Sequence, residues 1–252
     1  MVYIKGQNSW DGTGLDFSMD FQVVKEAVAL LRSRNICVML SVGGATYWTS
    51  DRELQQVDIR NLVADLGLNG VDIDFEVPGQ PQRLTSICKM MRDALPKECY
   101  LSMAGWSTGA FISDGTYSGS ALDALANAPL DVVNIMAYDA GDSYDAQAAW
   151  QAYKYKFKGA LCLGFEIGTQ GWGGHLLTAA EVTKNVTFVK QHCSDEDGIF
   201  VWNAKSQGIP NVKDVIATCV DVFRKPIIPS PSPGPPLAYS LTCPVCLTVY
   251  TK

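Results

Sequence analysis

Short runs of aliphatic and β-branched residues recur along the 252-residue chain at intervals of roughly 30 residues. Most of these runs are continuous rather than alternating with polar residues, which is typical of strands buried on both faces. The predicted strands are Val2–Ile4, Ile36–Val42, Val71–Phe75, Tyr100–Ala104, Asp131–Ala137, Ala160–Ile167 and Ile199–Trp202. Such spacing leaves room for one helix between each pair of strands.

Helical patterns fill the intervals. Residues 20–35 place apolar side chains on one helix face, and the segment Val212–Phe223 closes the folded part. Two segments have the capping-box sequence that opens helices, from Ser50 to Glu53 and from Thr178 to Glu181. Alternating strands and helices predict βαβ units and a parallel sheet.

Two architectures fit a parallel sheet: an open doubly wound sheet and a closed (β/α)8 barrel. A doubly wound nucleotide binder carries a glycine-rich turn after its first strand, and the sequence contains no G-x-G-x-x-G. Polar, aromatic or glycine residues instead follow nearly every predicted strand. A barrel gathers these strand ends in one mouth, so the α/β TIM-barrel class is favoured. The residues are Gly43, Gly44, Glu76, Trp106, Tyr138, Asp139, Glu166, Trp202 and Asn203.

The most informative segment is Asn69–Glu76, which reads NGVDIDFE. In a strand its three acids, Asp72, Asp74 and Glu76, share one face, and the intervening apolar residues point the other way. Burying three acids on one face is costly unless they are paired or used. Because the other predicted strands carry almost no Lys or Arg, a functional role is favoured over structural ion pairs.

Position within this strand suggests a division of labour. Glu76 comes last and should reach the mouth, with Asp74 one step deeper and Asp72 deepest. Two neighbouring carboxyl groups cannot both ionise cheaply, so the pKa of one rises. A proton retained at neutral pH would let Glu76 act as a general acid.

Four motifs resemble glycoside hydrolase family 18, the chitinases. They are SVGG at Ser41–Gly44, NGVDIDFE at Asn69–Glu76, MAYD at Met136–Asp139, and Trp202 late in a strand. Their order matches the third, fourth, sixth and eighth strands of that family, over residues 2–223. The resemblance implies a (β/α)8 barrel that hydrolyses chitin or N-acetylglucosamine oligosaccharides.

Roles follow from the resemblance, residue by residue. It implies that Glu76 protonates the glycosidic oxygen, that Asp74 turns between Glu76 and the substrate's acetamido group, and that Asp72 supports Asp74. It implies that Tyr138 steadies the acetamido carbonyl and that Trp202 lies under the distorted sugar. The acetamido oxygen itself attacks the anomeric carbon in this family, so the anomeric configuration is retained. The remaining candidates for substrate contact are Met136, Asp139, Trp106, Gly43, Gly44 and Met103.

The distribution of the six tryptophans also favours a carbohydrate ligand, because indole rings stack on sugar faces. Trp150 alone lies in a helical pattern, and an ordinary core position stays open for Trp48 and Trp106. The others fall in loops or at strand ends: Trp10, Trp48, Trp106, Trp172 and Trp202.

Some residues depart from the family pattern or stay unassigned. Asn69 replaces the first Asp of the family motif, with little catalytic effect expected. Glu166 could contact sugar at the rim or make a structural pair. His175 and His192 have no partner at metal-ligand spacing, so we expect no metal and no cofactor.

Composition excludes other classes. A net charge of −6 argues against a nucleic-acid partner. The sequence contains no run of 18 apolar residues, so no membrane span is predicted. We expect a monomer. The polar start is not a signal peptide, so secretion is expected from the family resemblance alone.

Three regions are predicted: a catalytic barrel at 1–225, a proline-rich linker at 226–236 and a short tail at 237–252. Cys243 and Cys246 form a lone C-x-x-C pair, for which a local disulfide or a redox role stays open.

Because SVGG marks the third strand of the family, Val2–Ile4 becomes the second. The barrel is then expected to lack its first strand–helix unit.

Two other functions remain. An endo-β-N-acetylglucosaminidase acting on glycans shares the acidic strand and differs in its loops. A chitin-binding lectin would keep the barrel without turnover, but such relatives usually lose the acid, and Glu76, Asp74, Asp72 and Tyr138 are all present.

Overall fold

The structure is a computed structural model. It describes residues 2–4, 9–10, 15–17, 20–44, 48, 56–107, 125, 127–139, 145–168, 175–202 and 207–225, with the backbone alone at residues 2–17 and 56–58. Several predictions lie outside the described residues. They are the capping sequence at 50–53, Trp172, Asn203, the linker at 226–236, and the tail at 237–252 with Cys243 and Cys246.

Among the described residues, six parallel strands form the main sheet, and each pairs with the next one in the chain. A doubly wound sheet reverses its strand order at a switch point, whereas neighbours in chain order are typical of barrel winding. The described strands therefore form a partial barrel with β4 and β9 at its edges. The strands are β4 (Met39–Gly43), β5 (Gly70–Asp74), β6 (Tyr100–Trp106), β7 (Val132–Met136), β8 (Ala160–Glu166) and β9 (Gly198–Trp202).

The strand predicted at Val2–Ile4 is present, but the expectation that it belongs to the parallel barrel sheet is wrong. This segment, β1, pairs antiparallel with β3 (Leu15–Phe17), which also pairs with β2 (Ser9–Trp10). Too few residues separate Ile4 from Leu15 for a helical crossover, whereas an antiparallel partner needs only a hairpin. Counting barrel strands from Val2–Ile4 as the second one therefore loses its support.

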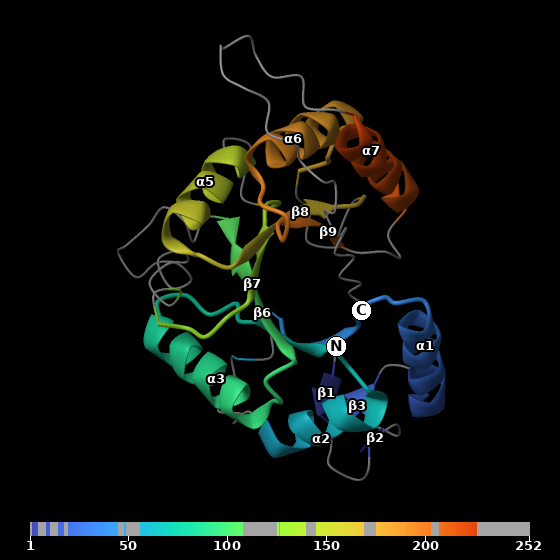
Figure 1. The fold of residues 1–252 in the computed structure, drawn as a ribbon, viewed down its shortest axis with the longest axis vertical. Helices are drawn as coiled ribbons and strands as arrows, with labels where there is room; N and C mark the ends of the chain where they lie inside the picture. The colour runs from blue at the N-terminus through green and yellow to red at the C-terminus, as the bar shows by residue number, and fades with distance from the viewer. Residues whose placement is uncertain are drawn as a thin grey trace.

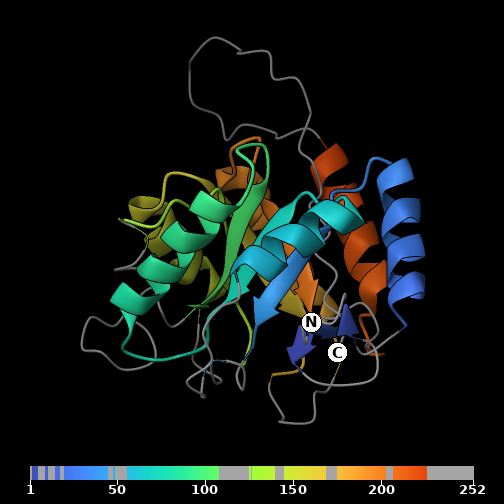
Figure 2. The ribbon, with the colours of Figure 1, turned by 90° about the horizontal axis from the view of Figure 1, so that it is seen from below.

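Helices surround the strands (Figure 1). In both views α1 and α3 lie on opposite sides of the molecule (Figures 1 and 2). None of the described helices is long and apolar enough to cross a bilayer. The helices are α1 (Phe21–Ser33), α2 (Gln56–Leu66), α3 (Pro81–Ala94), α5 (Ala146–Lys156), α6 (Ala179–His192) and α7 (Val212–Arg224).

Side chains at the helix starts explain where the helices begin. The predicted capping box of α6 is confirmed: the backbone N–H of Glu181 donates to Thr178 Oγ1, and the backbone N–H of Thr178 donates to the Glu181 carboxylate. Asn211 and Asp214 form a second capping box at α7. Asp20 caps α1, which begins at Phe21, because its side chain accepts from the N–H of Gln22 at 2.9 Å.

The two faces of the sheet bury different side chains. The outer face carries the aliphatic residues, such as Val71 and Ile73, which pack under the helices in one large core. The inner face holds the acids and a second, smaller cluster around Cys162 and Phe200. A period of two along each strand separates these environments.

At the amino end of the sheet, three side chains each bind a backbone N–H at the start of a neighbouring strand. Asn69 Oδ1 accepts from Val38 at 2.9 Å, Asp131 Oδ2 from Leu101 at 2.8 Å, and Asp197 Oδ1 from Leu161 at 2.7 Å. We call Asn69, Asp131 and Asp197 the amino-end clamps. Each immediately precedes or starts its own strand, so it reaches across to the adjacent one.

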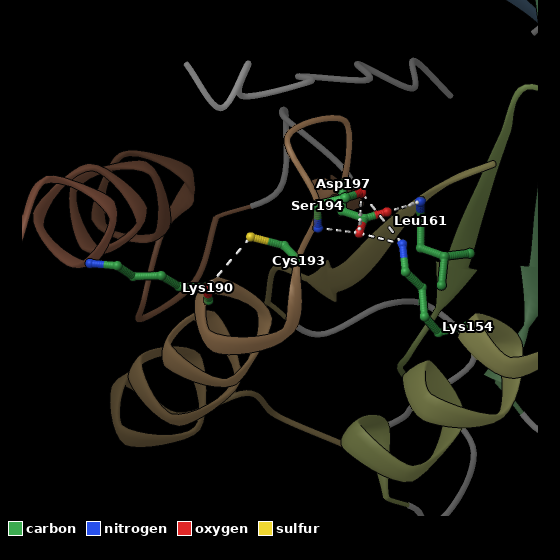
Figure 3. Close-up of polar contacts among 6 residues, drawn as sticks. All are labelled: Lys154, Leu161, Lys190, Cys193, Ser194 and Asp197. Carbon is green, nitrogen blue, oxygen red and sulfur yellow. Dashed lines mark hydrogen bonds and ion pairs between the residues drawn. The ribbon is translucent and has the colours of Figure 1, made fainter. Parts of the chain in front are cut away.

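Asp197 is the most elaborate clamp (Figure 3). It is fully buried, and its Oδ2 accepts from Lys154 Nζ at 2.6 Å and from the Ser194 backbone N–H at 2.7 Å. Since both oxygens have donors, the carboxylate is well compensated for its burial. Lys154 comes from α5, so Asp197 joins a helix to two strands.

Candidate active site

The alternation predicted for the acidic strand is confirmed. Asp72 and Asp74 are buried on the inner face of β5, while Val71 and Ile73 are buried on the outer face. Glu76 follows β5 by two residues and is half-buried. The three acids therefore lie in a row from the middle of the partial barrel toward its carboxyl end.

Asp72 is held by uncharged donors from three other strands. It accepts from Ser41 Oγ at 3.0 Å, Ser102 Oγ at 2.5 Å and Asn134 Nδ2 at 3.1 Å. These donors are not among the residues predicted from the sequence. Strand register could have found two of them, because Ser41, Asp72 and Ser102 pair in one row across β4, β5 and β6.

Asp74 lies between the other two acids. Burial first, then the negative charges of Glu76 and Asp72, raise the pKa of its carboxyl group well above the ordinary value. Its buried Oδ1 has no hydrogen-bond partner among the described residues. The raised pKa that the sequence predicts for one of two neighbouring acids is therefore found at Asp74.

Glu76 lies at the carboxyl end of the sheet. Trp106, the last residue of β6, donates from Nε1 to Glu76 Oε2 at 3.4 Å. The Tyr153 hydroxyl on α5 donates to the backbone carbonyl of Trp106 at 2.7 Å. Trp106 is half-buried, so its indole lies at the site and contacts the acid from the neighbouring strand.

Gly43, Gly44 and Trp48 fix the end of the acidic strand. The backbone carbonyl of Asp74 accepts from Trp48 Nε1 at 2.6 Å and from the Gly44 N–H at 2.9 Å. A Cβ on Gly43, whose φ is +135°, would lie 2.0 Å from that same oxygen. The two glycines thus allow close backbone approach beside Asp74.

Trp48 belongs to the core. Its side chain is 3% exposed and packs on Phe75, with ring centroids 5.3 Å apart. The alternative left open by the sequence is therefore the right one for this tryptophan. Trp150, as expected from its helical pattern, is buried in α5.

The inner-face cluster forms an apolar wall beside the acids. Cys162 and Phe200 are buried, and Met136, Tyr138 and Trp202 pack against them. The rings of Tyr138 and Phe200 meet edge-on with centroids 6.3 Å apart. Phe200 precedes Trp202 by two residues, so the period of a strand could have revealed it.

Tyr138 brings a hydroxyl group to the acids. Burial, followed by the negative charges of Asp74, Glu166, Glu76 and Asp139, raises the pKa of Tyr138 well above its ordinary value. The phenol therefore stays neutral and can donate a hydrogen bond. Asp139 follows it in a left-handed conformation with φ of +56° and is exposed.

Met103 lies away from these residues. It pairs in register with Ile73 and Val133, which are buried on the outer face, and a Cβ on Gly105 would meet both Met103 Cε and the Tyr153 hydroxyl. Because Ser102 of β6 faces inward to Asp72, the next residue, Met103, faces outward to the helices. Substrate contact by Met103 is therefore a wrong expectation.

Both histidines contact neighbouring side chains of the protein. His175 Nε2 contacts Glu181 at 2.7 Å, and the His192 ring stacks on Phe188 with centroids 4.2 Å apart. Within the described part of the chain, no group of three His, Cys, Asp or Glu side chains is placed to hold a metal ion. The side chain of Trp10 lies outside the described atoms.

Comparison with known proteins identifies the class. The family model described as "Glycosyl hydrolases family 18" matches residues 7–167. The chain belongs to this family. Endochitinase 1 of Metarhizium robertsii (strain ARSEF 23 / ATCC MYA-3075) is 27% identical over 171 residues. That alignment covers 61% of this chain and 39% of the endochitinase, so the chain spans well under half of this curated relative.

Solved structures share the fold. A GH18 chitinase from Pseudoalteromonas aurantia superposes with a TM-score of 0.65 at 19% identity, covering 81% of this chain and 83% of that one. A fungal endo-β-N-acetylglucosaminidase of family 18 also gives 0.65, at 17% identity, covering 88% and 84%. At these identities the likeness establishes the fold.

Proposed function

We propose that this chain is a chitinase that hydrolyses β-1,4 links between N-acetylglucosamine units with retention of configuration. The observation that carries the proposal is the row of Asp72, Asp74 and Glu76 on the inner face of β5, with the pKa of Asp74 raised. Membership in family 18 supports the same chemistry.

In the proposed reaction Glu76 is the acid and then the base. It protonates the glycosidic oxygen while the acetamido oxygen of the substrate attacks the anomeric carbon, so the leaving sugar departs as an alcohol. Glu76 then removes a proton from a water molecule. That water attacks the anomeric carbon from the face that the leaving sugar occupied, and the cyclic intermediate opens. Two inversions give net retention.

Asp74 supplies and receives the proton that this cycle needs. In the free protein its raised pKa keeps a proton beside Glu76. When the acetamido N–H of a substrate reaches Asp74, the ionised carboxylate becomes the better hydrogen-bond partner. The proton then resides on Glu76, where it is used. Asp72, fixed by Ser41, Ser102 and Asn134, keeps a second negative charge next to Asp74.

Tyr138 and Trp202 are proposed to hold the reacting sugar. The neutral Tyr138 hydroxyl would donate to the acetamido carbonyl, and Trp202 would lie beneath the ring with Met136 beside it. Trp106 would keep Glu76 directed at the cleft. Asp139 is proposed as an outer contact at the rim.

The test is incubation with a tetramer of β-1,4-linked N-acetylglucosamine, with products followed by chromatography and anomers by proton NMR. Wild type should release the β anomer first, and Glu76→Gln should be slower by roughly 10²–10⁴-fold. Glu196→Gln, which changes an exposed acid before β9, is the matched control and should match wild type. Equal cleavage by wild type and Glu76→Gln would contradict the proposal.

A second candidate is an endo-β-N-acetylglucosaminidase acting on glycans. It is favoured by the fold shared with the fungal enzyme of that name. Cleavage of a high-mannose glycan without cleavage of the tetramer would select it. Secretion, a monomeric state and the lack of a nucleic-acid partner stay predictions.

A further inference from the structure

Glu166 is a buried acid that the proposed reaction does not use. It is the last residue of β8, its side chain faces inward, and the residue is 3% exposed. We infer that Glu166 is a substrate-binding residue whose carboxylate accepts a hydrogen bond from a hydroxyl group of the sugar that lies on Trp202. This inference rests on the proposed function, since it concerns the same cleft.

The strand register places Glu166 between two residues of the proposed sugar site. Its Cα pairs directly with that of Trp202 on β9. On the other side, continuing the β7–β8 register beyond Ile135 and Leu163 brings Tyr138 level with Glu166. Glu166 and Trp202 therefore share one row across β8 and β9 at the carboxyl end of the sheet, and Tyr138, two residues after the end of β7, lies near Glu166.

The Phe200 ring lies one step below Glu166 on the inner face of the sheet. Two residues earlier on β8, Gly164 has no side chain, and the Phe200 ring fills that place: a Cβ on Gly164 would lie 2.4 Å from Phe200 Cζ. Phe200 thus forms an apolar floor below Glu166. Among the negative charges that raise the pKa of Tyr138, that of Glu166 ranks second, after that of Asp74.

This arrangement suits sugar recognition. A pyranose ring needs an apolar surface for one face and acceptors for the hydroxyl groups at its edge, and Trp202 and Glu166 would supply one of each. Hydrogen bonds between a neutral donor and a carboxylate are stronger than neutral pairs. Tyr138, by contrast, would donate to the acetamido carbonyl, so the two neighbouring side chains read different parts of the same sugar.

The test measures binding without turnover. The full chain carrying Glu76→Gln is titrated with the N-acetylglucosamine tetramer by calorimetry, alone and with Glu166→Gln, Glu166→Ala or the control Glu196→Gln. Glu166→Ala should raise Kd about tenfold or more, as expected for a hydrogen bond to a charged group. Glu166→Gln, which keeps an acceptor oxygen and the side-chain volume, should raise it less, and Glu196→Gln should leave it unchanged.

Kinetics in the otherwise unchanged chain give a second readout. Glu166→Ala should raise KM with kcat within about threefold of wild type, because the lost contact is made in both the ground and the transition state. A Kd within twofold of the parent for both Glu166 variants would overturn the inference. A fall in kcat at unchanged Kd would also overturn it, because Glu166 would then act through Tyr138. If Glu166→Ala does not fold, the Gln variant decides.

The outcomes separate this inference from the proposed function. If wild type does not cleave the tetramer but the tetramer still binds in a Glu166-dependent manner, the chitinase proposal fails and the Glu166 inference stands. If neither wild type nor Glu76→Gln binds the tetramer, the Glu166 inference fails as well.

Discussion

The two ends of the same sheet treat buried carboxyl groups in opposite ways. At the amino end Asp197 is fully buried and accepts from Lys154, Ser194 and Leu161. Toward the carboxyl end Asp74 is 7% exposed, lies between two further acids, and has a buried oxygen with no hydrogen-bond partner among the described residues.

The comparison distinguishes an acid whose contacts stabilise the fold from an acid whose burial is unfavourable. Donors and a cation compensate Asp197 for the loss of water, so its removal should cost stability. Among the described residues no such set of donors surrounds Asp74, whose raised pKa reflects an unfavourable environment for its charge. Groups held in such environments are candidates for chemistry.

The largest effect is expected from Asp74→Asn. The amide cannot carry a proton to and from Glu76, so kcat should fall by roughly 10²–10³-fold. The free energy of unfolding at neutral pH should stay the same or rise, because a poorly solvated acid is gone. Steady-state hydrolysis of the tetramer and urea denaturation of the same preparation measure the two. A loss of both activity and stability would remove the contrast with Asp197.

Asp197→Ala should show the reverse pattern. Removing the acid strands the N–H groups of Leu161 and Ser194 and unpairs Lys154, at a cost of about 3 kcal/mol of unfolding free energy. We take the lower end of the usual range because the Lys154 side chain is 35% exposed. Activity per folded molecule should be unchanged. Denaturant titration gives the first quantity, and kcat normalised to the folded fraction gives the second.

The pH dependence of stability should distinguish wild type from Asp74→Asn. Because folding raises the pKa of Asp74, the folded protein keeps a proton that the unfolded chain releases above about pH 4. Wild-type stability should therefore fall as pH rises from there through the folded-state pKa of Asp74. Each tenfold change in that ionisation equilibrium is worth about 1.4 kcal/mol, or roughly 3–6 °C in Tm. Parallel pH profiles for the two proteins would contradict the raised pKa.

The smallest effect concerns the simplest amino-end clamp. Asn69→Ala removes one hydrogen bond, from the Val38 N–H at 2.9 Å, and should cost about 1 kcal/mol of unfolding free energy. It should leave kcat and KM unchanged, because Asn69 lies at the amino end of β5, away from Glu76. A change in KM would mean that the two ends of the sheet are coupled.

Periodicity predicted much of this arrangement. Six of the predicted strands recur in the parallel sheet, and the alternation of Asp72, Asp74 and Glu76 with Val71 and Ile73 holds because a strand turns successive side chains to opposite faces. The capping box at Thr178 was readable because it is local in sequence.

What sequence could not supply is which strands become neighbours and how closely backbones approach. Val2–Ile4 resembles a barrel strand in composition, yet its partner is set by a nearby hairpin. Met103 lies in the right strand but on the wrong face. The donors to Asp72 come from strands 30 or more residues away, and only register brings them together.

The protonation state of Asp74 tests the central contrast most directly. Its side-chain carboxyl carbon can be followed by ¹³C NMR against pH and assigned by its absence in Asp74→Asn. The structure predicts that Asp74 keeps its proton to a higher pH than ordinary aspartates do, and that Glu76→Gln lowers its pKa by removing a neighbouring charge. An Asp74 that ionises together with ordinary aspartates, in both proteins, would contradict the division between the two ends of the sheet.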